Sequence, residues 1–104
     1  MIKTTKTTGF QMAFANGLTI SVQFGEINYS DITMTTPNSV SCPNAEVAAW
    51  DTVSGDWVNL AKLAKDGILE TGSKFNLTHS DLFMGFQTSN QVAHWIWLVS
   101  NVTR

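Results

Sequence analysis

The chain contains one cysteine, Cys42, and no long hydrophobic run. A single thiol cannot form an internal disulfide, which excludes a small scaffold held together by disulfides. The opening sequence MIKTTKTTGFQ has no apolar stretch that could act as a secretory signal. No segment approaches the roughly 20 apolar residues of a membrane-spanning helix. We therefore expect a cytoplasmic protein that does not enter a membrane.

Positive charge is missing from the middle of the chain, because no Lys or Arg lies between residues 7 and 61. Five acidic residues fall in that segment: Glu26, Asp31, Glu46, Asp51 and Asp56. An acidic surface repels phosphate groups, so direct nucleic-acid binding is disfavoured. Two interpretations stay open for this segment: a solvated acidic face, or an acidic patch for a basic partner.

Catalytic and metal-binding signatures are also missing. The sequence THSD at 78–81 places Ser, His and Asp side by side, but neighbouring residues point in different directions, whereas catalytic triads are assembled from separated positions. We expect a turn or a cap there. No pair among His79, His94 and Cys42 has the short spacing of zinc ligands, and no glycine-rich phosphate loop occurs. The sequence predicts no enzyme activity, no cofactor and no metal.

Apolar residues, by contrast, are plentiful. They make up 43% of the 104 residues and include four Trp and six Phe. This is enough material for one core, and the length leaves no room for a second one. We therefore treat residues 1–104 as a single domain.

The clearest local pattern is GFQMAFANGLTISVQF at 9–24, where two alternating apolar sets indicate half-buried strands. A two-residue turn at 16–17 would place these sets on opposite faces of the hairpin. A three-residue loop at 15–17, with Gly17 in a left-handed conformation, places both sets on one face. The predicted pairs are therefore Phe14 with Leu18, Met12 with Ile20, and Phe10 with Val22.

Residues 25–44 contain both prolines and many hydroxyl side chains, which predicts mostly loop with a short strand at Ile32–Met34. A loop of this length in a small domain is often functional, and a packed segment without function is the alternative. Tyr29, Met34 and Cys42 are the residues most worth testing there.

Three shorter elements follow the loop. The sequences AEVAAWD and DWVNL predict a hairpin around the Ser-Gly pair at 54–55. The sequence LAKLAKDG predicts one or two helical turns that end at Gly67. The apolar side of this helix would consist of Leu60, Leu63 and Ala64. The sequence LFMGFQ at 82–87 predicts a short buried strand.

A final helix is predicted from a cap at Thr88 or Ser89 to about Asn101. Projection at 100° per residue separates two stripes. The inner stripe contains Val92, Trp95, Ile96, Val99 and Val102, with Leu98 at its edge. The outer stripe contains Asn90, His94, Trp97 and Asn101. We expect Trp95 in the core, and Trp97 pointing outward unless the long loop covers it.

Together these elements predict an α+β fold, in which a small antiparallel β-meander of about five strands is covered on one face by the C-terminal helix. The helix is needed because the sheet has an apolar face to bury. The expected contacts are those of Trp95, Ile96 and Val99 with Phe14, Ile20 and Val22.

The segment MAFANGLTISVQFGEINYSD at 12–31 contains the motif F-x-N-G-x-T-[IV]-S-V-Q-[FW]-G. With it, the chain resembles small uncharacterised proteins carried by bacteriophages and prophages. The order of two later stretches, AEVAAWD and GFQTSNQV, is also similar, whereas the Trp-rich final helix departs from the pattern. The resemblance implies a phage origin and no particular activity or residue role.

Small non-catalytic phage proteins often bind host machinery, including restriction, CRISPR and signalling-nucleotide defence systems. We therefore expect a stoichiometric inhibitor of a host defence protein in the host cytoplasm. An outward Trp with a polar rim suits such a contact. The residues expected to bind the partner are Trp97, His94, Asn101, Asn90, Tyr29, Asp31 and Glu26. A symmetric contact between copies through the Trp97 face is a further expectation.

Two other functions stay open. One is an oligomer that sequesters a signalling nucleotide, which requires donors for phosphate and an aromatic platform for the base. The side chains available for this are Lys62, Lys65, Lys74 and Arg104, with Tyr29 or Trp57. The other is a minor virion or assembly component, for which a homo-oligomer is expected.

Overall fold

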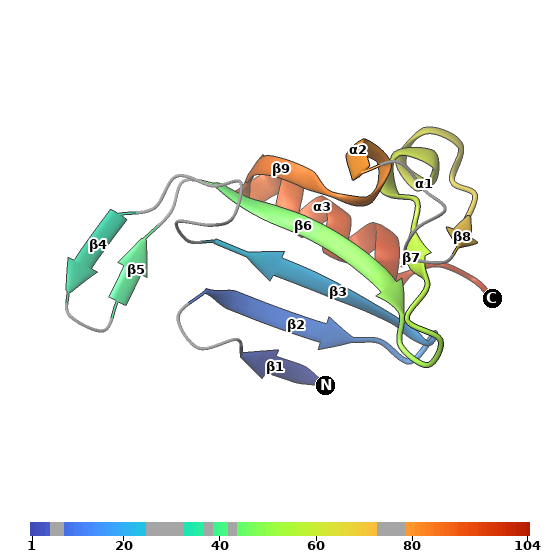
Figure 1. Ribbon diagram of the computed structural model, residues 1–104, viewed down its shortest axis with the longest axis horizontal. Coiled ribbons are helices and arrows are strands. Elements are labelled where there is room, and N and C mark those ends of the chain that lie inside the picture. Colours follow the sequence, from blue (N-terminus) through green and yellow to red (C-terminus); the bar gives the residue numbers. More distant parts are fainter. Residues whose placement is uncertain (5–7, 25–32, 37–38, 42–43, 73–78) are drawn as a thin grey trace.

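The computed structural model describes residues 1–4, 8–24, 33–36, 39–41, 44–72 and 79–104 (Figure 1). Within these residues an antiparallel sheet of seven strands carries a C-terminal helix, which confirms the α+β prediction. The strands of this sheet are β1 (Ile2–Thr4), β2 (Gly9–Ala13), β3 (Leu18–Gln23), β6 (Asn44–Asp51), β7 (Trp57–Val58), β8 (Thr71–Gly72) and β9 (Met84–Thr88). The helices are α1 (Leu60–Asp66), α2 (His79–Leu82) and α3 (Ser89–Ser100). The sheet exceeds the expected five strands by β1 and β8, which are too short to give an alternating pattern.

The first hairpin has the predicted register. The paired residues are Phe14 with Leu18, Met12 with Ile20, and Phe10 with Val22. Gly17 has a φ of +86°, the left-handed conformation that the three-residue loop requires. Both apolar sets therefore face the same side of the sheet, where they pack against α3.

β6 is the branch point of the sheet. One edge pairs with β3 along most of its length, and the other is shared between two strands (Figure 1). On the shared edge, Trp50 pairs with Trp57 of β7, whereas Asn44 and Ala45 pair with β9. The hairpin predicted around 54–55 is thus confirmed as β6 and β7. The last strand returns to the centre of the sheet and leads directly into α3.

A capping box fixes the start of α3. The hydroxyl of Thr88 accepts a hydrogen bond from the backbone nitrogen of Gln91 (3.3 Å), and the Gln91 side chain accepts one from the backbone nitrogen of Thr88 (2.8 Å). The helix ends at Ser100, one residue before the predicted end. None of the helices in the described ranges is long and apolar enough to cross a bilayer.

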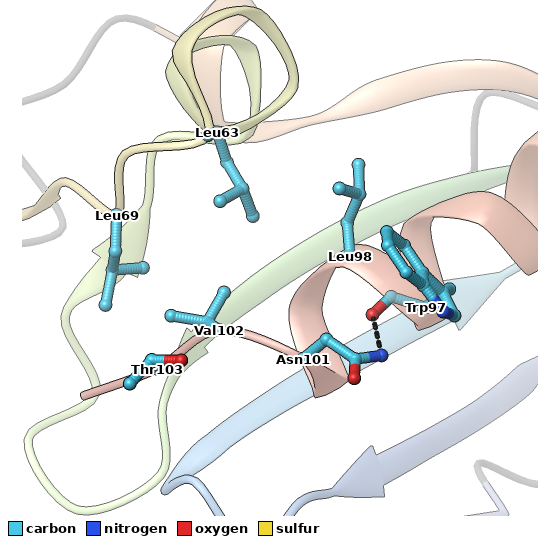
Figure 2. Close-up of a pocket in the computed structure, with 8 residues that line it drawn as sticks. Leu63, Leu69, Trp97, Leu98, Asn101, Val102 and Thr103 are labelled. Carbon is cyan, nitrogen blue, oxygen red and sulfur yellow. Dashed lines mark hydrogen bonds between the residues drawn. The ribbon is translucent and has the colours of Figure 1, made fainter.

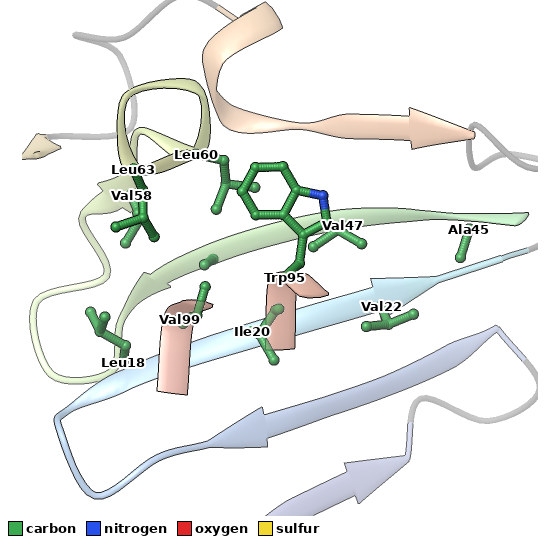
Figure 3. Close-up of a cluster of buried hydrophobic side chains, with 11 residues drawn as sticks. Leu18, Ile20, Val22, Ala45, Val47, Val58, Leu60, Leu63, Trp95 and Val99 are labelled. Atoms are coloured by element: carbon green, nitrogen blue, oxygen red, sulfur yellow. The ribbon is translucent and has the colours of Figure 1, made fainter. Parts of the chain in front are cut away.

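Trp95 is the central aromatic residue of the core, as predicted. Its side chain points from α3 into the space between Leu60 and Val47 (Figure 3). Only 7% of Trp95 is exposed, and its indole nitrogen donates a hydrogen bond to Gln87 Oε1 at 2.8 Å. The same cluster contains Val99, Ile20 and Val22, with Phe14 and Ile96 packed at its border. The predicted contact between α3 and the first hairpin is therefore confirmed.

β9 differs from the buried strand predicted at 82–87. The register shifts between Ala45 and Val47 of β6, so that β9 contributes Gly85 and Phe86 where β6 contributes only Glu46. This is a β-bulge, and Phe86 adopts a left-handed φ of +54° with its side chain exposed. The buried-strand prediction was wrong because a continuous apolar run does not reveal where a bulge interrupts the alternation of faces.

α1 ends at Gly67, which has a φ of +68° and caps the helix as predicted. Leu60 and Leu63 are buried, whereas Ala64 is exposed. The expectation that Ala64 shares their buried side was wrong, because this two-turn helix buries only the narrow stripe through the two leucines.

Two short strands, β4 (Thr33–Thr36) and β5 (Ser39–Ser41), form a separate antiparallel pair. Figure 1 shows this pair to one side of the main sheet, beyond the start of β6. The expected strand at Ile32–Met34 overlaps β4 only at Thr33 and Met34, and its partner was not predicted because the three residues of β5 are too few to show a pattern.

Candidate functional site

The outward side of α3 carries the four helix residues predicted to contact a partner. Asn90, His94, Trp97 and Asn101 are all exposed, because the opposite side of the helix is buried through Trp95. Ala93 is exposed on the same side of α3 as Trp97. We call the set Asn90, Ala93, His94, Trp97 and Asn101 the α3 face.

Trp97 is the largest exposed side chain of this face. It is 61% exposed, so the prediction that it points outward is confirmed. Residues 25–32 of the loop that was expected as a possible cover lie outside the described residues. The imidazole of His94 lies one turn earlier, with its ring nearly parallel to the indole at a centroid distance of 6.3 Å and an interplanar angle of 12°. The two rings form one aromatic surface on the helix.

An apolar groove borders Trp97 on the side facing α1. Its volume is about 300 Å³. The apolar side chains that line it are Leu63, Leu69, Trp97, Leu98 and Val102, and the polar ones include Asn101 and Thr103. Figure 2 shows Leu63 and Leu98 pointing into the space between α1 and α3. We call this hollow the Trp97 groove.

The groove was not predicted from the sequence, apart from the position of Leu98 at the edge of the inner stripe. Leu63 comes from α1 and Leu69 from the segment after it, 26 and 20 residues before the start of α3 at Ser89. Periodicity within one helix cannot show which distant element lies beside it. The position of α1 beside the end of α3 depends on the tertiary fold and cannot be read from either helix alone.

The residues after α3 form one wall of the groove and are fixed at two points. The Asn16 side chain donates to the carbonyl oxygen of Val102 at 3.2 Å. The guanidinium of Arg104 donates to the carbonyl oxygen of Asn16 at 3.2 Å and forms an ion pair with Asp51. The wall is therefore held by the first hairpin and by β6.

Asp51 is the anchor of that ion pair. Its Oδ1 accepts hydrogen bonds from the backbone nitrogens of Val53 and Ser54, each at 2.9 Å. The hydrogen bond from Ser54, followed by the one from Arg104, lowers the pKa of Asp51 from 3.8 to about 2. The carboxylate is thus charged throughout the neutral range, and its ion pair with Arg104 is retained there.

Asn101 has a structural task besides its place on the α3 face. Its side-chain nitrogen donates to the carbonyl oxygen of Trp97 at 2.8 Å, as does the backbone nitrogen at 3.1 Å. The Ser100 hydroxyl donates to the same oxygen at 3.0 Å, so the Trp97 carbonyl accepts three hydrogen bonds at the end of the helix. Asn101 therefore positions the last turn, and with it the backbone of Trp97.

The remaining predicted contact residues, Glu26, Tyr29 and Asp31, lie outside the described residues. The same holds for Cys42 and Lys74. A contact made by the acidic middle segment stays a prediction from sequence.

Two of the cations considered for phosphate binding are paired with carboxylates. Lys62 Nζ lies 3.1 Å from Asp66, which raises the pKa of the lysine, and Arg104 is engaged as described above. Trp57, considered as a platform for a base, packs edge-on against Trp50 at a centroid distance of 5.5 Å. Both of these cations thus already have a carboxylate partner, and one side of the Trp57 ring is taken up by Trp50.

In the part of the chain that the structure describes, no three His, Cys, Asp or Glu residues gather as metal ligands would. Of the segment at 78–81, expected to form a turn or a cap, residues 79–81 belong to the single helical turn of α2, and residue 78 lies outside the described residues. Comparison with protein-family models, with curated proteins and with solved structures finds no match. The α3 face and the Trp97 groove are therefore the features on which a function can be built.

Proposed function

We propose that this protein acts by stoichiometric binding to another protein through the α3 face and the Trp97 groove. The observation that carries the proposal is a Trp side chain, 61% exposed, beside an apolar groove of about 300 Å³. Covering both removes apolar surface from water, and Trp is among the residues that dominate binding energy at protein interfaces. Asn90, His94 and Asn101 supply the polar rim that such an interface needs.

The proposed partner is a host defence protein, such as a CRISPR or other immune effector, in the cytoplasm of a bacterial host. This part of the proposal rests on the resemblance of residues 12–31 to phage proteins and on the absence of a catalytic signature in the sequence. The proposed mechanism is occlusion, in which the bound chain covers a surface that the effector needs. It requires no chemical step.

A second region of contact is proposed for Glu26, Tyr29 and Asp31. These residues belong to the segment without Lys or Arg, so a basic surface on the partner would complement it. Charge reversal by Asp31→Lys should slow association and reduce its dependence on salt, because rim charges act mainly on the association rate.

The test is affinity capture from a bacterial host, followed by reconstitution with the purified captured protein. Trp97→Ala should weaken the complex roughly 30-fold, the effect of losing about 2 kcal/mol at an interface hot spot. Val53→Ala is the matched control, because Val53 is exposed in the turn between β6 and β7. Equal affinities for wild type and Trp97→Ala would overturn the proposed site, and a nucleotide released from the purified protein would favour sequestration instead.

A further inference from the structure

One wall of the Trp97 groove is formed by residues that follow α3. Val102 and Thr103 line the groove, and Arg104 comes next in the chain. Val102 is partly buried, whereas Thr103 and Arg104 are exposed. The backbone nitrogen of Val102 donates to the carbonyl oxygen of Val99 at 3.4 Å, which is long for a backbone hydrogen bond. We call Val102, Thr103 and Arg104 the strap, and its position depends on contacts made by side chains.

The guanidinium of Arg104 attaches the strap to two turns. Nη1 donates to the carbonyl oxygen of Asn16 at 3.2 Å, in the turn of the first hairpin, and Nη2 pairs with Oδ2 of Asp51, at the end of β6. Gly17 leaves room for this contact, because a Cβ atom there would lie only 2.9 Å from Nη1. The guanidinium thus lies against the turn at a position where a side chain would obstruct it.

The carboxylate of Asp51 is oriented independently of Arg104. Its Oδ1 accepts hydrogen bonds from the backbone nitrogens of Val53 and Ser54, which leaves Oδ2 for the guanidinium. Exposed ion pairs are weak partly because two long side chains must be ordered, and here one partner is already fixed. The Asp51 side chain is also only 14% exposed, so salt screens this pair less than a fully solvated one. The ion pair is therefore able to hold the strap in place.

These contacts can break while the rest of the fold stays intact. Asn16 and Asp51 lie at turns, and Val99, which is fully buried in α3, comes three residues before Val102. A further contact, from the Asn16 side chain to the Val102 carbonyl oxygen at 3.2 Å, is a neutral hydrogen bond, which is weaker than a charged one. Segments held by a few polar contacts at the surface open locally without unfolding of the domain. Opening of the strap removes one wall of the Trp97 groove.

We infer that the ion pair between Arg104 and Asp51 keeps the strap closed against the Trp97 groove, and that the strap opens locally when this pair is broken. Arg104 and Asp51 are then positioning residues for the groove, although neither is among the residues that line it. The consequence for binding rests on the proposed function: a partner that fits the closed groove binds less tightly when one wall is open. α3 itself contains no Asp, Glu, Lys or Arg, so the charges that govern this site lie outside the helix.

Amide hydrogen exchange of the full chain, followed by NMR, tests the strap without any partner. Arg104→Gln should raise the exchange rates of the Asn101 and Val102 amides roughly fivefold, the scale expected for a partly exposed ion pair, and leave those of β3 unchanged. The methyl resonances of Val102 and Leu69, which line the groove, should shift. Arg104→Lys keeps the charge and should restore part of the protection.

Asp51→Asn removes the other charge but keeps an oxygen for Val53 and Ser54, so it should raise the same exchange rates. The double variant should exchange no faster than either single variant, because both changes break one contact. Lys3→Gln is the matched control, since it removes one positive charge at an exposed site on β1 and should have no effect. Exchange rates and methyl resonances that match wild type in Arg104→Gln, or that change equally in Lys3→Gln, overturn the inference.

With a captured partner protein, Arg104→Gln should raise the dissociation constant roughly fivefold, in step with the opening of the strap. An open strap with unchanged affinity overturns its role in binding, and the proposed function stands if Trp97→Ala still weakens the complex. Opening of the strap in a protein that binds no partner through Trp97 does the reverse: the role of the ion pair stands and the proposed function falls.

Discussion

The side-chain nitrogen of Asn16 lies 2.8 Å from the carbonyl oxygen of Val99, to which it donates a hydrogen bond across 83 positions of sequence. The same nitrogen donates to Val102, and Asn16 Oδ1 accepts from the backbone nitrogen of Leu18 at 3.1 Å. One amide thus closes the turn of the first hairpin and adds a hydrogen bond to the carbonyl oxygens of Val99, in the last turn of α3, and of Val102, just after it.

Asn16→Ala should lower the free energy of unfolding by about 1–3 kcal/mol, because Leu18 in the hairpin turn and the carbonyl oxygens of Val99 and Val102 each lose a hydrogen bond. Urea denaturation measures the change. Asn90→Ala removes the same side chain from the exposed start of α3 and should cost only a few tenths of a kcal/mol. Equal losses for the two variants would show that the contact with α3 contributes nothing.

Trp95→Ala should cost roughly 3–5 kcal/mol of unfolding free energy, the usual loss for a buried aromatic residue replaced by alanine. Trp95→Phe keeps most of the ring but leaves Gln87 without its indole donor, so its cost should be smaller and still measurable. Trp97→Ala should cost far less, since that side chain is mostly exposed. Similar losses for Trp95→Ala and Trp97→Ala would contradict the orientation of α3.

Thr88→Ala should lower the free energy of unfolding by about 1 kcal/mol, because it removes the side-chain acceptor of the capping box. Ser89→Ala is the control at the next position, where the hydroxyl is not the cap, and it should change stability little. Thermal unfolding of both variants compares them directly. If the serine variant loses as much as the threonine variant, the helix does not start at the cap described here.

Asp51 makes the folded state sensitive to acid. Its pKa is about 2 in the folded protein and 3.8 ordinarily, so the folded state binds fewer protons between these values. The stability that Asp51 contributes is therefore complete above pH 3.8 and is lost as the pH falls to about 2. The difference in unfolding free energy between wild type and Asp51→Asn should shrink over that range in urea titrations. If the difference in unfolding free energy between the two proteins stayed constant with pH, the pKa of Asp51 would not be lowered in the folded state.

The sequence predicts the parts of this fold that a local pattern determines. The register of the first hairpin follows from the need to place two apolar sets on one face, and the orientation of Trp95 and Trp97 follows from the period of the helix. The exposure of Asn90, His94 and Asn101 beside Trp97 was predicted for the same reason. In each of these cases the residues that determine the register or the orientation are close together in the sequence.

The missed features depend on contacts between distant segments. The bulge at Phe86 depends on where β6 is shared between β7 and β9, and the Trp97 groove depends on where α1 lies against α3. Asn16 was interpreted as a turn residue only, because its second role requires the end of α3 to be in place. The contact predicted for Glu26, Tyr29 and Asp31 stays a prediction.

The bond between Asn16 and Val99 also bears on how the chain is synthesised. The hairpin that contains Leu18, Ile20 and Val22 leaves the ribosome early, yet the helix that buries its apolar face is translated about eighty residues later. Until then this face has no cover, and exposed apolar strands are prone to aggregation. At translation rates of roughly 5–20 residues per second the nascent hairpin waits several seconds for α3, a window in which a chaperone of the producing cell could bind it.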